Sequence, residues 1–301
     1  MQVPKFLKPG DLIEILAPAK AIESHYVEYA KDFLIESGFA VRISDHCLGQ
    51  VNYFSGTLEE RKTDFQNAMN DIEVNAILCA RGGYGCVQYS DDLDWSAFEK
   101  SPKWIVGFSD VTVFHQKLQK MGFASIHGSM PLNFEENSEE ALSTLVSALS
   151  GTLQSMQVPS DSNNQLGKVR SHILGGNLCI LSSLIGTNDQ PNFNNAILFV
   201  EEIDEPLYAI DRMFFSLKKA GILETLGGLI VGGMTSIKDS AIPYGSSFKE
   251  IILSHVSELN IPVCFNFPAG HIDDNRAIIF GTTCDFEVTE SAATITYLGE
   301  R

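Results

Sequence analysis

The chain has 301 residues, of which 38 are Asp or Glu and 21 are Lys or Arg, and its formal net charge is −17. Hydrophobic residues make up 44% of it and charged residues 20%, which is typical of a folded protein and excludes a disordered one. The excess of acid would repel phosphate backbones and anionic lipid headgroups, which argues against roles at nucleic acids or membrane surfaces. The length predicts roughly two domains.

The beginning of the chain, MQVPKFLKPGD, lacks the apolar stretch of a signal peptide, and no run of about 18 apolar residues follows. We therefore expect a cytoplasmic protein. The cysteines lie in apolar segments without CxxC spacing, which predicts buried thiols and neither disulfides nor a zinc site. They are Cys47, Cys79, Cys86, Cys179, Cys264 and Cys284.

Short β-rich runs alternate with helical patterns through residues 1–150. The strands are expected over 12–17, 40–43, 74–79 and 104–108. The helices are expected over 22–36, after a capping box of Thr57 and Glu60, and after the fourth strand, where the helix ends before Gly122. This alternation predicts an α/β domain with a parallel sheet and helices on both faces.

Residues 151–168 are polar and interrupt the alternation, so we expect a linker there and a second α/β domain, richer in strand, over 169–301. Its strands are expected over 196–201, 228–236, 262–267, 277–280 and 293–297, with an antiparallel pair at the end. Its helices are expected over about 176–186, 207–220 and 247–259. Two unlike halves predict an active site in the crevice between them.

The segment WIVGFSDVTVFHQKL places Ser109 where a buried apolar strand turns into a helix. Gly107 permits a sharp turn, and this is the geometry of a nucleophile elbow, which presents a serine hydroxyl at the carboxyl end of a sheet. The first amides of the helix point to the same spot and can stabilise an oxyanion. The G-x-S-x-G motif is not matched, because Val111 and Thr112 follow Asp110. The alternative interpretation is that Ser109 or Asp110 only caps the helix.

A glycine-rich loop, ARGGYG over 80–85, follows the strand expected at 74–79. Its glycines allow the backbone to approach a ligand or to direct an amide at it. The loop lacks both the G-x-G-x-x-G spacing and the lysine of a phosphate-binding loop. Because strand-end loops converge at the carboxyl edge of a parallel sheet, this loop is a candidate for the second oxyanion amide. The alternative is an ordinary tight turn.

A serine nucleophile needs a base, and His271 is the leading candidate because it follows an apolar strand and the turn Pro-Ala-Gly. A carboxylate should orient the imidazole, and the run AILFVEEIDEP ends a strand with Glu201 and Glu202. Adjacent residues on a strand face opposite sides, so one of the two can point at the site. Lesser candidates for the base are His127 and His172, whereas surface or packing roles fit His25, His115 and His255.

Together these segments resemble the LD-carboxypeptidase family of serine peptidases, which includes murein tetrapeptide carboxypeptidase and the microcin C immunity peptidase. The resemblance runs through nearly the whole chain, and the order and spacing of the segments make it specific. The segments are GDLIEILAPA near the start, the helix with Arg61 and Asp64, ARGGYG at 80–85, GFSD at 107–110, HGSM at 127–130, GGNL at 175–178, LFVEEIDEPLYAIDRM at 198–213 and GH at 270–271.

The resemblance implies a catalytic triad of Ser109, Glu201 and His271, in which Glu201 is preferred to Glu202 because the family's acid directly follows the L-F-x end of the strand. It also implies a flavodoxin-like amino-terminal domain that carries the serine and a swivelling, β-rich α/β carboxy-terminal domain that carries the other two residues. No metal and no cofactor are expected, and the family often forms homodimers.

The implied activity is that of a serine L,D-carboxypeptidase, which removes the terminal D-alanine from cytoplasmic murein tetrapeptide during peptidoglycan recycling. The backbone amides of Asp110 and Gly83 would hold the oxyanion. Arg81, beside Gly82 and Tyr84, is the candidate for binding the terminal carboxylate of the peptide, because a guanidinium can engage both oxygens. The alternative is that Arg81 pairs with a surface acid.

Two departures from the family pattern bear on the identity of the substrate. The first turn reads Ala17-Pro18-Ala19 where members commonly have a serine after the proline, and IDDNRAIIFG lacks the proline often found before its glycine. One alternative function is therefore a microcin C immunity-like peptidase that cleaves peptidyl or aminoacyl nucleotides. Such enzymes commonly have a longer catalytic loop, for which 301 residues leave little room. Another alternative is a non-catalytic binding module on the same fold.

Overall fold

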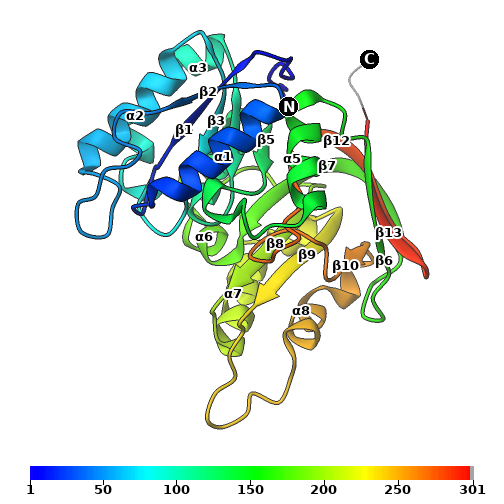
Figure 1. The fold of residues 1–301 in the computed structure, drawn as a ribbon. Coiled ribbons are helices and arrows are strands. Elements are labelled where there is room, and N and C mark those ends of the chain that lie inside the picture. Colours follow the sequence, from blue (N-terminus) through cyan, green and yellow to red (C-terminus); the bar gives the residue numbers. More distant parts are fainter. Residues whose placement is uncertain (299–301) are drawn as a thin grey trace.

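Two β-sheets organise residues 1–298, the part of the chain that the computed structural model describes (Figure 1). The first sheet has the order β11-β5-β4-β3-β1-β2, in which β1 to β5 run parallel and β11 is antiparallel to β5. The parallel part has the strand order of flavodoxin-like folds. Its strands are β1 (Leu12–Leu16), β2 (Ala40–Ile43), β3 (Val74–Cys79), β4 (Trp104–Gly107), β5 (Ser125–His127) and β11 (Ile278–Phe280).

Helices cover both faces of this sheet, as the alternation of elements predicts. One apolar core joins α1 and α5 to alternate strand residues such as Ile15 and Val106. The other joins α2, α3 and α4 to the residues between them, such as Leu16 and Ile105. The helices are α1 (Ser24–Glu36), α2 (Leu58–Asn70), α3 (Ser96–Lys100), α4 (Thr112–Met121) and α5 (Glu139–Ser150).

The second sheet has the order β10-β9-β8-β7-β12-β13-β6, with parallel strands from β10 to β7 and antiparallel strands from β7 to β6. Helices α6, α7 and α8 pack on one face of its parallel part. The strands are β6 (Ser155–Pro159), β7 (Gly167–Asn177), β8 (Ile197–Ile203), β9 (Gly228–Thr235), β10 (Val263–Cys264), β12 (Thr283–Val288) and β13 (Ala292–Tyr297). The helices are α6 (Leu178–Ser183), α7 (Leu207–Lys219) and α8 (Phe248–Val256).

Three features of the second half differ from the sequence-based expectations. The expected linker over 151–168 contains strand β6 and the first residues of β7, because Met156 and Val158 alternate with exposed residues and pack into a core. The strand expected over 262–267 shortens to β10. The strand at 278–280 leaves its own half and joins the first sheet beside β5.

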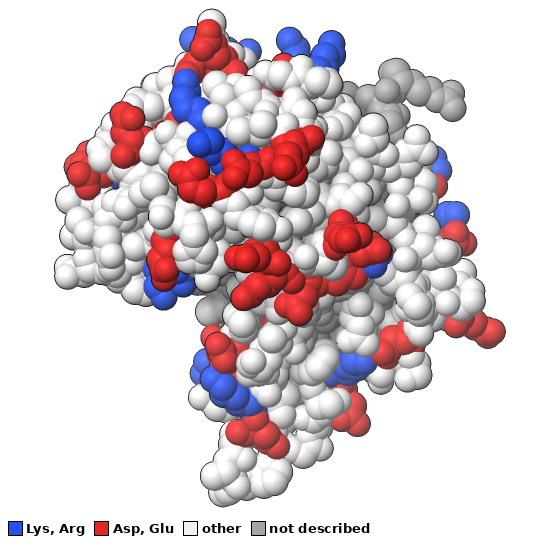
Figure 2. Space-filling view, viewed as in Figure 1, with Lys and Arg blue, Asp and Glu red and all other residues white. Residues whose placement is uncertain are grey.

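The cysteine prediction holds at five of the six positions, and Cys179 is the exception because it is exposed. It lies in the first turn of α6, where Leu178 and Leu181 occupy the buried positions. Within the described residues, no helix combines the length and the apolar character needed to cross a bilayer. Figure 2 shows carboxylates spread over the upper and lower parts of one face, with Lys and Arg side chains scattered between them.

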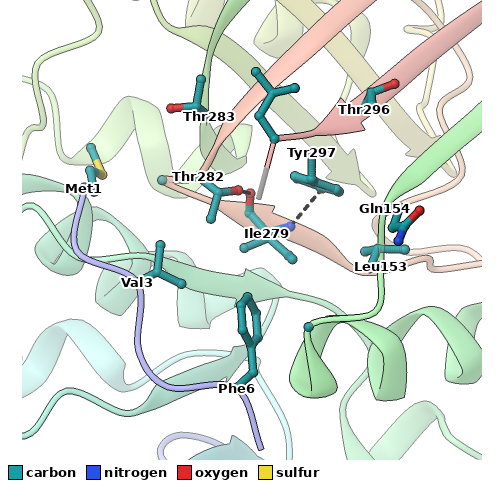
Figure 3. A pocket seen from close by; sticks show the side chains of 13 residues that line it. Met1, Val3, Phe6, Leu153, Gln154, Ile279, Thr282, Thr283, Thr296 and Tyr297 are labelled. Carbon is teal, nitrogen blue, oxygen red and sulfur yellow. Dashed lines mark hydrogen bonds between the residues drawn. The ribbon is translucent and has the colours of Figure 1, made fainter. Parts of the chain in front are cut away.

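A cavity of about 530 Å³ lies where the amino-terminal segment meets the ends of both sheets. Met1, Val3 and Phe6 line one side, and Ile279 and Tyr297 line the other, with the Tyr297 hydroxyl accepting a hydrogen bond of 3.0 Å from the Ile279 amide (Figure 3). None of the described lining residues is Lys, Arg, Asp or Glu.

The capping box at the start of α2 is confirmed and gives a stability prediction. The Thr57 hydroxyl accepts a hydrogen bond from the Glu60 amide at 3.2 Å, and the Glu60 carboxylate accepts one from the Thr57 amide at 2.7 Å. Thr57→Ala should lower the free energy of unfolding by about 1 kcal/mol, whereas Thr57→Ser should keep it. Urea denaturation measures both variants, and equal midpoints for the alanine variant and the wild type would contradict this.

Candidate active site

The turn after β4 holds Ser109 in an uncommon backbone conformation. Its φ of +62° is in the left-handed region, which costs a residue with a side chain about 1–3 kcal/mol. Gly107, two residues earlier, has a φ of +156°, and a Cβ there would lie 2.9 Å from Val111 Cγ2. A glycine is therefore required before the serine, and a short 3₁₀ turn over 109–111 leads from the serine into α4. This is the strained strand-to-helix turn predicted for a nucleophile.

Neither Ser109 nor Asp110 caps the helix, so the alternative interpretation of this segment is wrong. The carboxylate of Asp110 is 1% exposed and accepts a hydrogen bond of 2.9 Å from the amide of Cys86, just after the glycine-rich loop. Burial raises the pKa of Asp110, although the hydrogen bonds from Cys86 and Gly85 and the charge of Arg61 oppose this effect. The side chain thus ties the nucleophile turn to the glycine-rich loop.

The fold brings together three side chains that are far apart in the sequence. His271 lies 162 residues from Ser109 and 70 residues from Glu201. His271 Nδ1 lies 2.6 Å from Glu201 Oε2, and His271 Nε2 lies 3.2 Å from Ser109 Oγ. The Glu201 side chain is fully buried, whereas that of His271 is 18% exposed. The three side chains predicted for the triad are therefore within hydrogen-bond reach of one another.

This geometry assigns the protons of the imidazole. An ionised carboxylate can only accept, so Nδ1 of His271 carries the proton donated to Glu201 and Nε2 is free to accept the Ser109 hydroxyl proton. Burial lowers the pKa of His271, but the charge and hydrogen bond of Glu201, with the charges of Glu202 and Asp204, outweigh burial and raise it. Glu201 therefore orients the ring and favours its protonated form.

The two adjacent glutamates at the end of β8 point to different partners, as strand geometry predicts. Glu201 follows Phe199 on the face away from the helices and reaches His271. Glu202 instead accepts hydrogen bonds from the side chain of Asn177 and from the amides of Cys179 and its own neighbour. Glu202 therefore secures the start of α6 and is not available to the imidazole.

Hydrogen bonds fasten the loop that carries His271 to the first half of the chain. Asn275 Oδ1 accepts from the Gly270 amide at 2.7 Å, and Ser129 Oγ donates to the Asn275 carbonyl at 3.2 Å. The Asp273 carbonyl accepts from both the amide of Ser138 and the side chain of residue 137. The chain then continues into β11, which pairs with β5. The imidazole is thus positioned from both sheets, because Thr235 Oγ1 of β9 also donates to the His271 carbonyl at 2.7 Å.

The glycine-rich loop lies directly against the candidate nucleophile. A Cβ at Gly82 would be 3.0 Å from Ser109 Cβ, 3.2 Å from its Oγ and 3.3 Å from the Asp110 amide nitrogen. Gly83 has a φ of +106°, and a Cβ there would lie 2.9 Å from Lys20 Cβ. The missing side chain at Gly82 therefore leaves free space next to the hydroxyl and the Asp110 amide, where an oxyanion would have to lie.

Arg81 and Tyr84, the other two residues predicted for substrate binding, flank the glycines of this loop. One guanidinium nitrogen of Arg81 donates a hydrogen bond of 3.1 Å to the Ala21 carbonyl, and Arg81 forms no ion pair within residues 1–298. The alternative in which Arg81 pairs with a surface acid is therefore not what the structure has. Tyr84 is 50% exposed, with its ring 6.4 Å from that of Phe54.

Two buried residues support the nucleophile turn and the glycine-rich loop, and the sequence indicates Arg61 only as part of a family segment and His115 only for a surface or packing role. Arg61 is 3% exposed and donates to the carbonyls of Pro18 and Gly85, both at 3.3 Å. His115, also buried, has Nε2 at 2.8 Å from the Gly107 carbonyl and Nδ1 at 2.8 Å from a serine hydroxyl. Burial lowers the pKa of His115 to about 4, so the ring is neutral and Nε2 must donate to the carbonyl.

Two family models match most of the chain. The model described as the LD-carboxypeptidase N-terminal domain matches residues 13–128, and that of the LD-carboxypeptidase C-terminal domain matches residues 170–286. A putative carboxypeptidase of Synechocystis sp. is 30% identical over 295 residues, which are 97% of this chain and 96% of that protein.

Solved structures with the same fold include the muramoyltetrapeptide carboxypeptidase from Oxalobacter formigenes. It superposes with a TM-score of 0.87 at 28% identity and covers 96% of this chain and 99% of its own. The microcin C7 self-immunity protein MccF, in complex with aspartyl sulfamoyl adenosine, superposes with a TM-score of 0.87 at 21% identity and covers 99% of each chain. At that identity, the second likeness concerns the fold alone.

The space beside Gly82 gives a prediction for hydrolytic activity. Gly82→Ala would place a methyl group against Ser109 Oγ and the Asp110 amide. We expect kcat/KM to fall at least about 100-fold, as when an oxyanion donor is lost, with little change in the melting temperature. Gly128→Ala is the control, because its nearest contact would be an ordinary 3.4 Å. Full activity of Gly82→Ala would show that no substrate oxygen occupies this space.

Proposed function

The chain belongs to the LD-carboxypeptidase family, and from this premise we propose that it is a serine L,D-carboxypeptidase that removes the terminal D-alanine from murein tetrapeptide. The observation that carries the proposal is the hydrogen-bonded series from Ser109 Oγ through the His271 imidazole to the buried Glu201 carboxylate. A serine, a base and an orienting acid in this order are the parts needed to turn a hydroxyl into a nucleophile.

In the proposed first step, His271 Nε2 accepts the hydroxyl proton while Ser109 Oγ attacks the carbonyl carbon of the last peptide bond. The resulting oxyanion is held by the amides of Asp110 and Gly83. The C–N bond then breaks, and the imidazolium gives its proton to the departing amine of D-alanine. The product of this step is an ester between the shortened peptide and Ser109.

In the second step, the same imidazole accepts a proton from water, whose oxygen attacks the ester carbonyl carbon. The ester bond breaks, and Ser109 Oγ takes the proton back from His271. The carboxylate of Glu201 stays ionised throughout and stabilises the charged imidazolium in both steps. No group outside this chain and water is needed to balance the reaction.

Murein tetrapeptide is the substrate that the family relationship favours, and a solved relative at 28% identity is a muramoyltetrapeptide carboxypeptidase. We place the reaction in the cytoplasm, in peptidoglycan recycling, and propose a homodimer, as is common in the family. A peptide substrate also suits the net charge of −17, which disfavours nucleic acids as partners.

The substrate and the nucleophile are tested together by mass spectrometry of murein tetrapeptide after incubation with the protein. The wild type should release one alanine, and Ser109→Ala should reduce the rate by roughly a million-fold, because it removes the attacking atom. Ser143→Ala, at an exposed position on α5, is the control and should behave as the wild type.

The other outcomes separate the alternatives. Equal turnover by the wild type and Ser109→Ala would remove Ser109 from the mechanism. Intact tetrapeptide together with cleavage of an aminoacyl-nucleotide analogue would favour an immunity-type peptidase. A shift in melting temperature with the peptide, and no product, would favour a binding module.

The role of Glu201 predicts a change in the pH dependence. His271 acts as a base when neutral, so kcat/KM should rise with pH through the pKa of His271, which lies above its ordinary value of about 6.5. Glu201→Gln removes the charge that raises the pKa of His271 against the effect of burial. The rise of kcat/KM with pH should therefore move to lower pH, while kcat falls about 10³- to 10⁴-fold. Glu224→Gln, at an exposed position, is the control. An unchanged pH dependence in Glu201→Gln would contradict the assignment.

A further inference from the structure

Lys20 lies beside the glycine-rich loop, next to the candidate active site. Its backbone amide donates to the Gly82 carbonyl at 3.4 Å. The Lys20 side chain packs on Gly83, where an added Cβ would lie 2.9 Å from Lys20 Cβ and 3.5 Å from Lys20 Cδ. Its ammonium nitrogen is 5.0 Å from the centre of the Tyr53 ring, an attractive cation–π distance. The lysine stem is therefore held in place, and the charge is at its end.

The ammonium of Lys20 has no acidic partner among residues 1–298, and neither does the guanidinium of Arg81. Other lysines, such as Lys31 and Lys62, pair with acids one helical turn away. Two neighbouring cations without carboxylate partners create a positive potential beside the glycine-rich loop, inside an otherwise acidic protein.

The position of this charge matches the chemistry of a carboxypeptidase. Gly82 is in contact with Ser109, and Gly83 is in contact with Lys20, so two loop residues separate the nucleophile from the lysine stem. In the substrate, the terminal carboxylate is one residue beyond the bond that is cut, a step of about 3.8 Å between Cα atoms. The long side chain of Lys20 begins next to Gly83, the proposed oxyanion donor, and is suited to reach that carboxylate.

We propose that Lys20 binds the terminal carboxylate of the peptide, which rests on the proposed function. Arg81 differs from Lys20 in that one of its nitrogens donates to the Ala21 carbonyl, next to Lys20, while its other N–H groups have no partner within residues 1–298. Arg81 thereby holds the segment that carries Lys20, and it acts as a positioning residue. The ammonium of Lys20, whose stem is fixed by Gly83 and Tyr53, donates no hydrogen bond within residues 1–298, so all of its N–H groups are free for an anion.

The test compares murein tetrapeptide that has a free terminal carboxylate with the same peptide as its terminal amide. The wild type should cleave the acid at least about tenfold more efficiently than the amide. Lys20→Met should lose this preference through a rise in KM for the acid, with kcat for the acid little changed. Lys20→Arg keeps the charge and should retain part of the preference. Lys120→Met, at an exposed position on α4, should behave as the wild type.

The outcomes separate this inference from the proposed function. Cleavage of the acid by the wild type supports the carboxypeptidase, whatever the variants do. If Lys20→Met then keeps the wild-type preference for acid over amide, the assignment of Lys20 is overturned. If Arg81→Met alone abolishes the preference and Lys20→Met does not, Arg81 is the anion-binding residue. If the wild type cleaves neither peptide, the proposed function fails and the role of Lys20 fails with it.

Discussion

The pairing of β11 with β5 is the constraint on which the active-site geometry depends. Strand β11 comes from the second half of the chain, yet it extends the sheet in which β4 ends at the nucleophile turn. The loop with His271 enters this strand directly, and Ser129 and Asn275 fasten the loop further. The loop is also held to the second sheet, where Thr235 Oγ1 donates to the His271 carbonyl at 2.7 Å, so contacts to both sheets set the distance between imidazole and hydroxyl.

A buried carboxylate gives this arrangement its electrostatic character. Removing Glu201 from water is costly, and its hydrogen bond to His271 offsets part of that cost. The neighbouring Glu202 is also buried, but its carboxylate accepts hydrogen bonds from N–H donors around the start of α6. Identical side chains at adjacent positions thus have separate tasks, one in polarising an imidazole and the other in joining α6 to the sheet.

The sequence predicts what depends on local patterns and misses what depends on distant partners. The turn at Ser109 is predictable because an apolar strand, a glycine and a helical pattern follow one another within a few residues. The edge strand β6 is not, because only Met156 and Val158 are apolar in it and the pairing with β13 forms far along the chain. The contacts of His115 and Arg61 are not predictable for a related reason, since their partners include backbone carbonyls, which no sequence motif marks.

Two buried polar side chains near the site, Arg61 and Asp110, each bind the backbone of a loop. Arg61 donates hydrogen bonds to the Pro18 carbonyl in the first turn and to the Gly85 carbonyl in the glycine-rich loop. Asp110 accepts a hydrogen bond from the amide of Cys86, just after that loop. Because the loop is held in this way, Gly82 and Gly83 keep fixed places beside Ser109. Donors that are oriented before the substrate arrives need no reorganisation when charge develops, and this preorganisation is the main source of oxyanion stabilisation. The strain at Ser109 persists because these contacts surround it.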